Sequence, residues 1–135
     1  MFSKKLIALK SLFIFLVLMC AGCAPSPKML TEQGLVFYKG AGTPVNHEKA
    51  FELWRRAADR KYARAQTNLG LLYSKGQGVE KNASKAAELY NLSAAQGDAK
   101  GEGVLGMSYL YGWGVEKDSI KAVELLKRSG NAGFV

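Results

Sequence analysis

Cysteine and histidine are scarce in this chain of 135 residues, and their scarcity excludes several kinds of site. Cys20 and Cys23 both lie near the N-terminus, so the rest of the chain cannot hold a disulfide framework. His47 is the single histidine, and no further ligands stand around it at the spacing of a metal site, so we expect it to be solvated. The same scarcity argues against Ser–His–Asp chemistry. The sequence therefore predicts no enzyme, no cofactor, no metal and no small-molecule substrate.

Acidic residues are outnumbered by basic ones, but the excess is modest once the N-terminal segment is set aside. The formal net charge is +8. Of the 19 basic residues, Lys4, Lys5 and Lys10 lie in that segment, which leaves 16 basic against 11 acidic residues, or +5. A nucleic-acid-binding protein is expected to show a focused basic face with a recognisable reading motif. No such motif is evident, so we expect no nucleic-acid partner.

The densest group of basic side chains lies between residues 55 and 64. Its members are Arg55, Arg56, Arg60, Lys61 and Arg64. Basic side chains near the end of a helix interact favourably with the helix dipole, and this together with ordinary solvation is one interpretation. A contact with anionic lipid headgroups or with an acidic partner is the other.

The first 22 residues have the pattern of a secretory signal peptide. Lysines precede a short apolar run at residues 12–19, and small residues follow it. The run is shorter than the ~20 residues that span a bilayer comfortably. The Ala-Gly-Cys sequence that ends at Cys23 resembles the bacterial lipobox, although Cys20 stands where a leucine is usual. This resemblance implies cleavage before Cys23 and lipidation of that cysteine; cleavage after Ala24 and an uncleaved anchor are the alternatives.

Residues 23–27 are predicted to form a short tether between the lipid and the rest of the protein. Pro25 and Pro27 lead us to expect no helix before about Lys28. Ala24 resembles the sorting signal for the outer membrane. We therefore expect a protein of the bacterial cell envelope, anchored by an N-terminal lipid, facing the periplasm and held close to the lipid surface.

A repeat with a period of 36 residues organises the remainder of the chain. The segment 73–90 reads YSKGQGVEKNASKAAELY, and the segments one period before and after it read FYKGAGTPVNHEKAFELW and YLYGWGVEKDSIKAVELL. Three units, 28–63, 64–99 and 100–135, follow one another without gaps. A fixed period in this range is the signature of a repeat array, and three units provide about the minimum stable core. We expect a single domain.

Each unit is predicted to be a pair of helices joined by a glycine-rich loop. In the second unit, apolar residues from Ala65 to Tyr73 follow the spacing of an amphipathic helix. Gly70 interrupts this helix at a cost of about 1 kcal/mol, which indicates close approach of the partner helix. Gly76 is the candidate C-cap and Asn82 the candidate N-cap of the second helix. The corresponding structural glycines of the loops and helices are Gly70, Gly76, Gly78, Gly106, Gly112 and Gly114.

These residues resemble the Sel-1-like repeat, a relative of the tetratricopeptide repeat. The pattern runs from Ala65 through Leu69-Gly70 and the G-x-G-V loop at residues 76–79 to Ala94 and Gly97. The resemblance implies an all-α fold, a right-handed α-solenoid of three helix-turn-helix repeats whose first helices line a concave surface. It also implies a scaffold that binds another protein, often in bacterial envelopes, and no catalytic site. The first unit departs from the pattern and is expected to be a capping repeat.

Aromatic residues replace polar ones in the loop of the third unit. Leu110, Tyr111 and Trp113 stand where the second unit has Ser74, Lys75 and Gln77. Aromatic residues at a loop rim are typical of a partner surface. Packing within the third unit, to cover the end of the array at Phe134 and Val135, is the alternative interpretation. If the loop does not bind the partner, we expect the site on the concave face near Thr67, Leu71 and Met107.

The expected function is that of a lipid-anchored periplasmic adaptor that binds another protein. As an alternative, small envelope lipoproteins with such repeats resemble immunity proteins that neutralise antibacterial phospholipase effectors of a contact-dependent secretion system. The sequence names neither the partner nor the choice between these roles.

Overall fold

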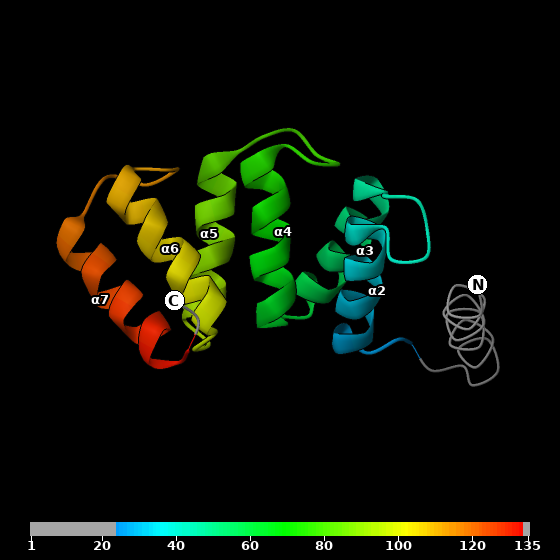
Figure 1. The fold of residues 1–135 in the computed structure, drawn as a ribbon, viewed down its shortest axis with the longest axis horizontal. Coiled ribbons are helices and arrows are strands. Elements are labelled where there is room, and N and C mark those ends of the chain that lie inside the picture. Colours follow the sequence, from blue (N-terminus) through cyan, green and yellow to red (C-terminus); the bar gives the residue numbers. More distant parts are fainter. Residues whose placement is uncertain (1–23, 134–135) are drawn as a thin grey trace.

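The computed structural model describes residues 24–133, which form six α-helices and no strand (Figure 1). The bounds of the helices are α2 Pro27–Lys39, α3 His47–Asp59, α4 Ala63–Lys75, α5 Ala83–Ala94, α6 Ala99–Tyr111 and α7 Ser119–Asn131. The fold is therefore the predicted all-α solenoid of helical repeats. The predicted signal peptide at residues 1–22, the lipidation site Cys23, and the terminal Phe134 and Val135 lie outside the described residues.

The helices pack in three pairs, and the pairs stack in the order of the sequence (Figure 1). The pairs are α2 with α3, α4 with α5, and α6 with α7. The first helix begins at Pro27, one residue earlier than expected from the prolines, and Ser26 caps it by accepting from the Met29 N–H at 3.2 Å. Proline is tolerated at the first helical position because its missing N–H would have no partner there in any case.

The predicted helix ends are confirmed in all three pairs. In the second pair, Gly76 ends α4 with φ 68°, and its N–H donates to the Leu72 carbonyl at 2.8 Å. Asn82 begins α5 by accepting from the Lys85 N–H at 2.9 Å. The equivalent residues of the other pairs are Gly40 and Gly112 at the C-caps, and Asn46 and Asp118 at the N-caps. Recurrence of the same caps explains why the loops keep one length.

The second glycine of the loop lies against the preceding pair of helices in the second and third repeats. A Cβ on Gly78 would lie 2.5 Å from the carbonyl carbon of His47, at the start of α3. A Cβ on Gly114 would overlap the carbonyl oxygen of Ala83, at the start of α5. The sequence predicts only that Gly78 opens a loop. The structure shows that these two glycines allow neighbouring repeats to stack.

The mid-helix glycines are sites of close helix packing, as predicted. A Cβ on Gly70 would lie 2.5 Å from the Tyr90 ring, and one on Gly106 would lie 2.9 Å from Leu126 Cγ. In both cases the obstructing side chain comes from the second helix of the same pair. Absence of a side chain at these two positions therefore lets each helix pair close.

Lysines at equivalent positions cover aromatic rings in each pair. Lys121 Nζ lies 4.6 Å from the centroid of Tyr109. The matching contacts are Lys85 over Tyr73 at 5.4 Å and Lys49 over Phe37 at 5.8 Å. A lysine ammonium within about 6 Å of a ring face is attracted to it. This contact is a physical reason why lysine recurs every 36 residues at the start of the second helix.

Candidate functional site

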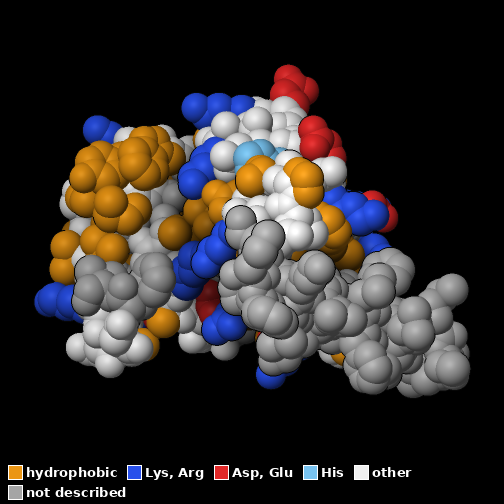
Figure 2. Space-filling view, turned by 45° about the vertical axis from the view of Figure 1, so that its right-hand side comes forward, with side chains coloured by type: hydrophobic (Ala, Val, Ile, Leu, Met, Phe, Trp, Pro, Cys, Tyr) orange, Lys and Arg blue, Asp and Glu red, His pale blue; other side chains and the backbone are white. Residues whose placement is uncertain are grey.

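A groove of about 540 Å³ runs along the face formed by the first helices of the pairs. Residues of α2, α4 and the start of α6 line it, together with Trp54 of α3 and the two residues that follow α7, Ala132 and Gly133. The lining residues that matter most for its chemistry are Leu35, Tyr38, Lys39, Arg64, Asn68, Leu71 and Lys100. Figure 2 shows Lys and Arg side chains, with an acidic side chain among them, beside the end of the molecule that carries α6 and α7.

The helical spacing of α4 explains how it supplies this lining. Arg64, Asn68, Leu71 and Lys75 follow one another at intervals of four, three and four residues, so they share one face of the helix. On that face a basic residue stands near each end of the helix and a leucine lies between them. The 36-residue period carries the pattern to the neighbouring first helices, where Leu35 and Met107 match Leu71.

Lys100 is the basic residue that the groove affects most strongly. Its Nζ donates to Asn68 Oδ1 at 3.2 Å. Burial lowers the pKa of Lys100 because it disfavours the charged form. Asp98 acts in the opposite direction, whereas the positive charges of Arg64, Lys39 and Lys75 lower the pKa further. The positive charges of Lys39, Arg64 and Lys75 therefore reach Lys100 from α2 and α4.

Tyr38 connects two of the repeats beside the groove. Its hydroxyl accepts a hydrogen bond from Lys75 Nζ at 3.3 Å and donates to Gln77 Oε1 at 3.3 Å. Tyr38 lies on α2, whereas Lys75 and Gln77 lie at the end of α4 and in the loop that follows. The contact therefore fixes the last turn of α4 against the first repeat.

Thr67 does not lie on the groove surface, which corrects the prediction for this residue. Its side chain is fully buried. The hydroxyl lies 2.7 Å from Ser93 Oγ and 3.0 Å from Asp98 Oδ2, and it joins α4 to the end of α5. Leu71 does line the groove, and Met107 is partly exposed at the equivalent position of α6. Thr67 therefore belongs to the interior and cannot contact a partner directly.

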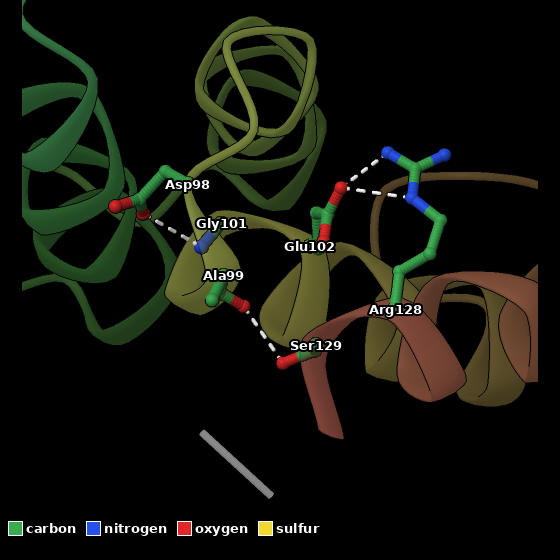
Figure 3. A network of polar contacts seen from close by, with 6 residues as sticks. All are labelled: Asp98, Ala99, Gly101, Glu102, Arg128 and Ser129. Carbon is green, nitrogen blue, oxygen red and sulfur yellow. Dashed lines mark hydrogen bonds and ion pairs between the residues drawn. The ribbon is translucent and has the colours of Figure 1, made fainter. Parts of the chain in front are cut away.

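A polar network at the start of the third repeat is structural in the same way (Figure 3). Asp98 Oδ2 accepts from the Gly101 N–H at 2.9 Å, and Ser129 Oγ donates to the Ala99 carbonyl at 2.7 Å. Arg128 pairs with the buried carboxylate of Glu102. These contacts join α7 to α6 and hold the helix start that carries Lys100.

Comparison with known proteins agrees with this geometry. A family model described as Sel1 repeat matches residues 34–62, 63–98 and 103–134. The chain belongs to the Sel1 repeat family. Proteins built from Sel1 repeats are generally non-enzymatic scaffolds for protein–protein interaction. Comparison with curated proteins finds no match.

Two solved structures resemble this Sel1 repeat chain over most of its length. A Sel1 repeat protein from Oxalobacter formigenes is 34% identical with a TM-score of 0.75, and the match covers 81% of this chain and 43% of that one. The protective antigen c5321 of uropathogenic Escherichia coli, which displays an SLR fold, is 29% identical with a TM-score of 0.75. That match covers 79% of this chain and 23% of the antigen. The chain thus spans less than half the length of either protein.

The aromatic residues in the loop of the third Sel1 repeat form a second exposed feature. Tyr111 is 49% exposed and Trp113 is 56% exposed, and their rings stack with centroids 4.8 Å apart. Leu110 beside them is partly exposed. Figure 2 shows hydrophobic side chains gathered at the end of the molecule where α6 and α7 lie. The two rings do not line the groove, so the structure keeps the two predicted binding regions separate.

The basic group at residues 55–64 is divided among different surroundings. Arg55 forms an exposed ion pair with Asp59 at 3.6 Å. Arg60 donates to the Pro25 carbonyl at 2.6 Å, so it holds the predicted tether against the end of α3. Arg64 is exposed and lines the groove. These side chains therefore do not form one surface.

Of the groove cations, the sequence analysis named Arg64 within the basic group at residues 55–64 but missed Lys39, Lys75 and Lys100. Lys39 and Lys75 are separated by 36 residues, as are Arg64 and Lys100, so a search for rows of like charge at the repeat period could have found them. Among residues 24–133, no helix is both long and apolar enough to span a membrane. In the same range, no three His, Cys, Asp or Glu side chains are grouped closely enough to hold a metal ion.

Proposed function

We propose that this Sel1 repeat chain is a lipid-anchored scaffold of the bacterial envelope that binds another protein. The observation that carries the proposal is the stacked pair of Tyr111 and Trp113, about half of whose surface is exposed. Large aromatic side chains that stay exposed on a folded domain are typical anchors for a protein partner. Neither ring is among the side chains that pack on the two core clusters of the described residues, which favours a binding role over cover for the end of the array.

The anchoring part of the proposal rests on the N-terminal sequence and on one contact. The lipobox-like sequence ending at Cys23 supplies the attachment point. Arg60 holds Pro25 through its carbonyl, so the free part of a tether that starts at Cys23 is very short. The end of α3 would then lie next to the membrane, and the aromatic loop of the third repeat would be presented away from it, toward the periplasm.

Capture from detergent-solubilised envelopes tests the binding function. We expect Trp113→Ala to weaken capture of the partner by about 30-fold, which corresponds to the ~2 kcal/mol of an aromatic hot spot. Ile120→Ala is the matched control because Ile120 is an exposed apolar side chain, 85% accessible, on α7. If Trp113→Ala instead leaves the affinity per folded molecule unchanged and lowers the melting temperature, the ring stabilises the third repeat by covering it and does not bind the partner.

The identity of the captured protein separates the two expected roles. An envelope assembly factor would support the adaptor role. A phospholipase effector would support the immunity role, and neutralisation of its activity by the added chain would then be the direct measurement.

Substitution of Cys23 by serine tests the anchor. We expect Cys23→Ser to accumulate as an unprocessed precursor or as a soluble species, because the thiol at the expected lipidation position is absent. N-terminal sequencing and detergent partitioning of the wild-type protein complete the test. A mature protein that partitions into detergent but begins at a residue other than Cys23 would contradict the lipobox interpretation.

A further inference from the structure

The groove on the first helices concentrates positive charge. Lys39, Arg64 and Lys100 line it, and Lys75 lies on the same face of α4 as Arg64. Among residues 24–133 the ion pairs are Arg55–Asp59 and Arg128–Glu102, so none of the four groove cations has a carboxylate within 4 Å. Lys100 is half-buried, and the partner of its Nζ is the neutral Asn68 Oδ1 at 3.2 Å, whereas Lys39, Arg64 and Lys75 are exposed. A bound carboxylate would supply the charge partner that the half-buried ammonium of Lys100 lacks.

The one carboxylate that lines the groove is occupied by the fold. Asp98 Oδ2 accepts from the Gly101 N–H at 2.9 Å and lies within hydrogen-bond distance of Thr67 and Ser93. All three contacts are to Oδ2, which is held by the fold at the start of α6. The single negative charge of Asp98 is outnumbered by the positive charges of Lys39, Arg64 and Lys100, which line the same groove. Glu32 stands at the position of α2 equivalent to Asn68, but it does not line the groove. The groove thus keeps a net positive charge.

An apolar strip lies between the basic residues. Leu35 is 39% exposed, and Leu71 lines the groove next to it in the adjoining repeat. On α4, Leu71 stands between Arg64 and Lys75, which are about 16 Å apart along the helix axis. A small anion could use the cations but would leave the strip exposed. A ligand that matches both features carries carboxylates on either side of an apolar side chain.

The shape of the groove favours a protein segment over a lipid surface. Lys100 is only partly exposed, and its ammonium is held against Asn68 inside the concave face. A flat bilayer surface reaches convex or protruding cations and cannot enter a groove of this kind. An extended or helical segment of a partner can enter it, as peptides enter grooves between helices.

We propose that this groove is the docking site for an acidic segment of the partner protein. Arg64 and Lys100 bind carboxylates at one side of the groove, and Lys39 and Lys75 bind them at the other. An apolar residue of the segment packs on Leu35 and Leu71 between them. The proposal rests on the proposed function, because it requires a protein partner. It concerns a different surface from Tyr111 and Trp113, so the two can fail independently.

Selection from a random peptide display library with the full chain in detergent micelles tests the ligand chemistry. We expect the enriched peptides to carry two or more Asp or Glu residues flanking a Leu, Ile, Val or Phe. The best enriched peptide, labelled with fluorescein, then serves as the probe for fluorescence anisotropy. Enrichment of neutral or basic peptides, or of none, would overturn the proposal.

Two pairs of variants test the location of the site. We expect the double substitution Arg64→Gln and Lys100→Gln to weaken binding of the probe tenfold or more. The control double substitution, Lys117→Gln and Lys127→Gln, removes the same net charge from exposed positions outside the groove and should change affinity less than twofold. We expect Leu35→Ser to weaken binding severalfold, whereas Val123→Ser, at a 48% exposed position on α7, should not. Equal effects within either pair would contradict the proposed site.

Two further outcomes keep the alternatives apart. Thermal unfolding of each variant is the control for folding. We expect an unchanged melting temperature, so that a loss of binding cannot be attributed to a loss of the fold. Dihexanoyl phosphatidylglycerol, a soluble anionic lipid, serves as the second probe. If the wild type binds this lipid, the Arg64 and Lys100 variant does not, and no acidic peptide is enriched, the proposal is overturned and the cations bind lipid headgroups instead. If Trp113→Ala abolishes capture of the envelope partner but the groove variants retain it, the scaffold function stands and the groove proposal falls.

Discussion

Gly114 lies so close to Ala83 that a Cβ on the glycine would overlap the carbonyl oxygen of the alanine. Gly114 belongs to the loop of the third repeat, and Ala83 is the first residue of α5 in the second. Gly78 has the same relation to His47 one repeat earlier. In the loops of the second and third repeats, the two glycines therefore have different roles: the first ends a helix, and the second lets the loop pack against the preceding repeat.

Alanine substitutions at Gly114 and Gly97 should separate these effects. Both glycines have positive φ, 72° and 78°, but a Cβ on Gly97 would meet no atom within 4 Å. We expect Gly97→Ala to lower the free energy of unfolding by about 1–2 kcal/mol, the cost of the left-handed backbone alone. Gly114→Ala should lower it by about 3 kcal/mol or more, because overpacking against backbone is added. Urea unfolding measures both, and equal losses would show that the loop does not stack as described.

Gly70 and Gly106 should respond differently to alanine although they are equivalent in the repeat. A Cβ on Gly70 meets the buried ring of Tyr90, whereas one on Gly106 meets Leu126, a partly exposed aliphatic side chain that can move. Alanine gains about 1 kcal/mol in helix propensity at both positions. We expect Gly70→Ala to be destabilising by about 1–3 kcal/mol and Gly106→Ala to be close to neutral.

Valine at Gly106 is the control for that comparison. Its branched side chain leaves no room for Leu126 to adjust, so Gly106→Val should cost about 1–3 kcal/mol in thermal or chemical unfolding. If both alanine variants melt at a higher temperature than the wild type, close packing is not the reason for these glycines.

Asp98 should matter more for stability than Asp118, although both cap a helix. Asp118 makes one exposed cap, to the Lys121 N–H at 3.0 Å. Asp98 caps α6 and also faces the buried hydroxyls of Thr67 and Ser93. We expect Asp118→Ala to cost about 1 kcal/mol, and Asp98→Ala about 2–4 kcal/mol because buried hydroxyls lose a partner. Similar losses in urea unfolding would mean that the hydroxyls satisfy each other without Asp98.

The lowered pKa of Lys100 predicts a pH dependence of stability. Burial is its main cause, so the folded protein binds this proton less tightly than the unfolded chain, whose lysine has a pKa of 10.5. Between the folded pKa and 10.5 the unfolded state carries more protons, and the free energy of unfolding therefore rises with pH. We expect the stability of the wild type relative to Lys100→Met to increase as the pH rises from below the folded pKa of Lys100 toward 10.5.

The comparison with Lys100→Met also cancels a second group that titrates in the alkaline range. Burial raises the pKa of Tyr90, against a smaller lowering by its hydrogen bond with Ser74, and both proteins retain this tyrosine. Urea unfolding at a series of pH values gives the difference directly. A difference that stays constant across the range would show that Lys100 is not affected by the groove.

The sequence by itself determined the helices, their ends and their order. The caps at Gly76 and Asn82, the loop between them and the close packing at Gly70 follow from local chemistry and from spacing, and the 36-residue period extends each of them to the other repeats. Local signals of this kind need no knowledge of distant residues, because an N-cap or a left-handed glycine acts within a few positions of the chain.

Only the tertiary structure decided which side chains of a helix face the groove. Thr67 and Asn68 are adjacent polar residues, and both are largely buried. Thr67 faces Ser93 and Asp98 in the interior, whereas Asn68 lines the groove and accepts from Lys100. Similarly, Arg60 and Arg64 belong to one basic group in the sequence, but one holds Pro25 and the other faces the groove. The 36-residue period predicts which positions are equivalent. The stacking of the helix pairs determines which of these positions are buried and which charged side chains lie close together.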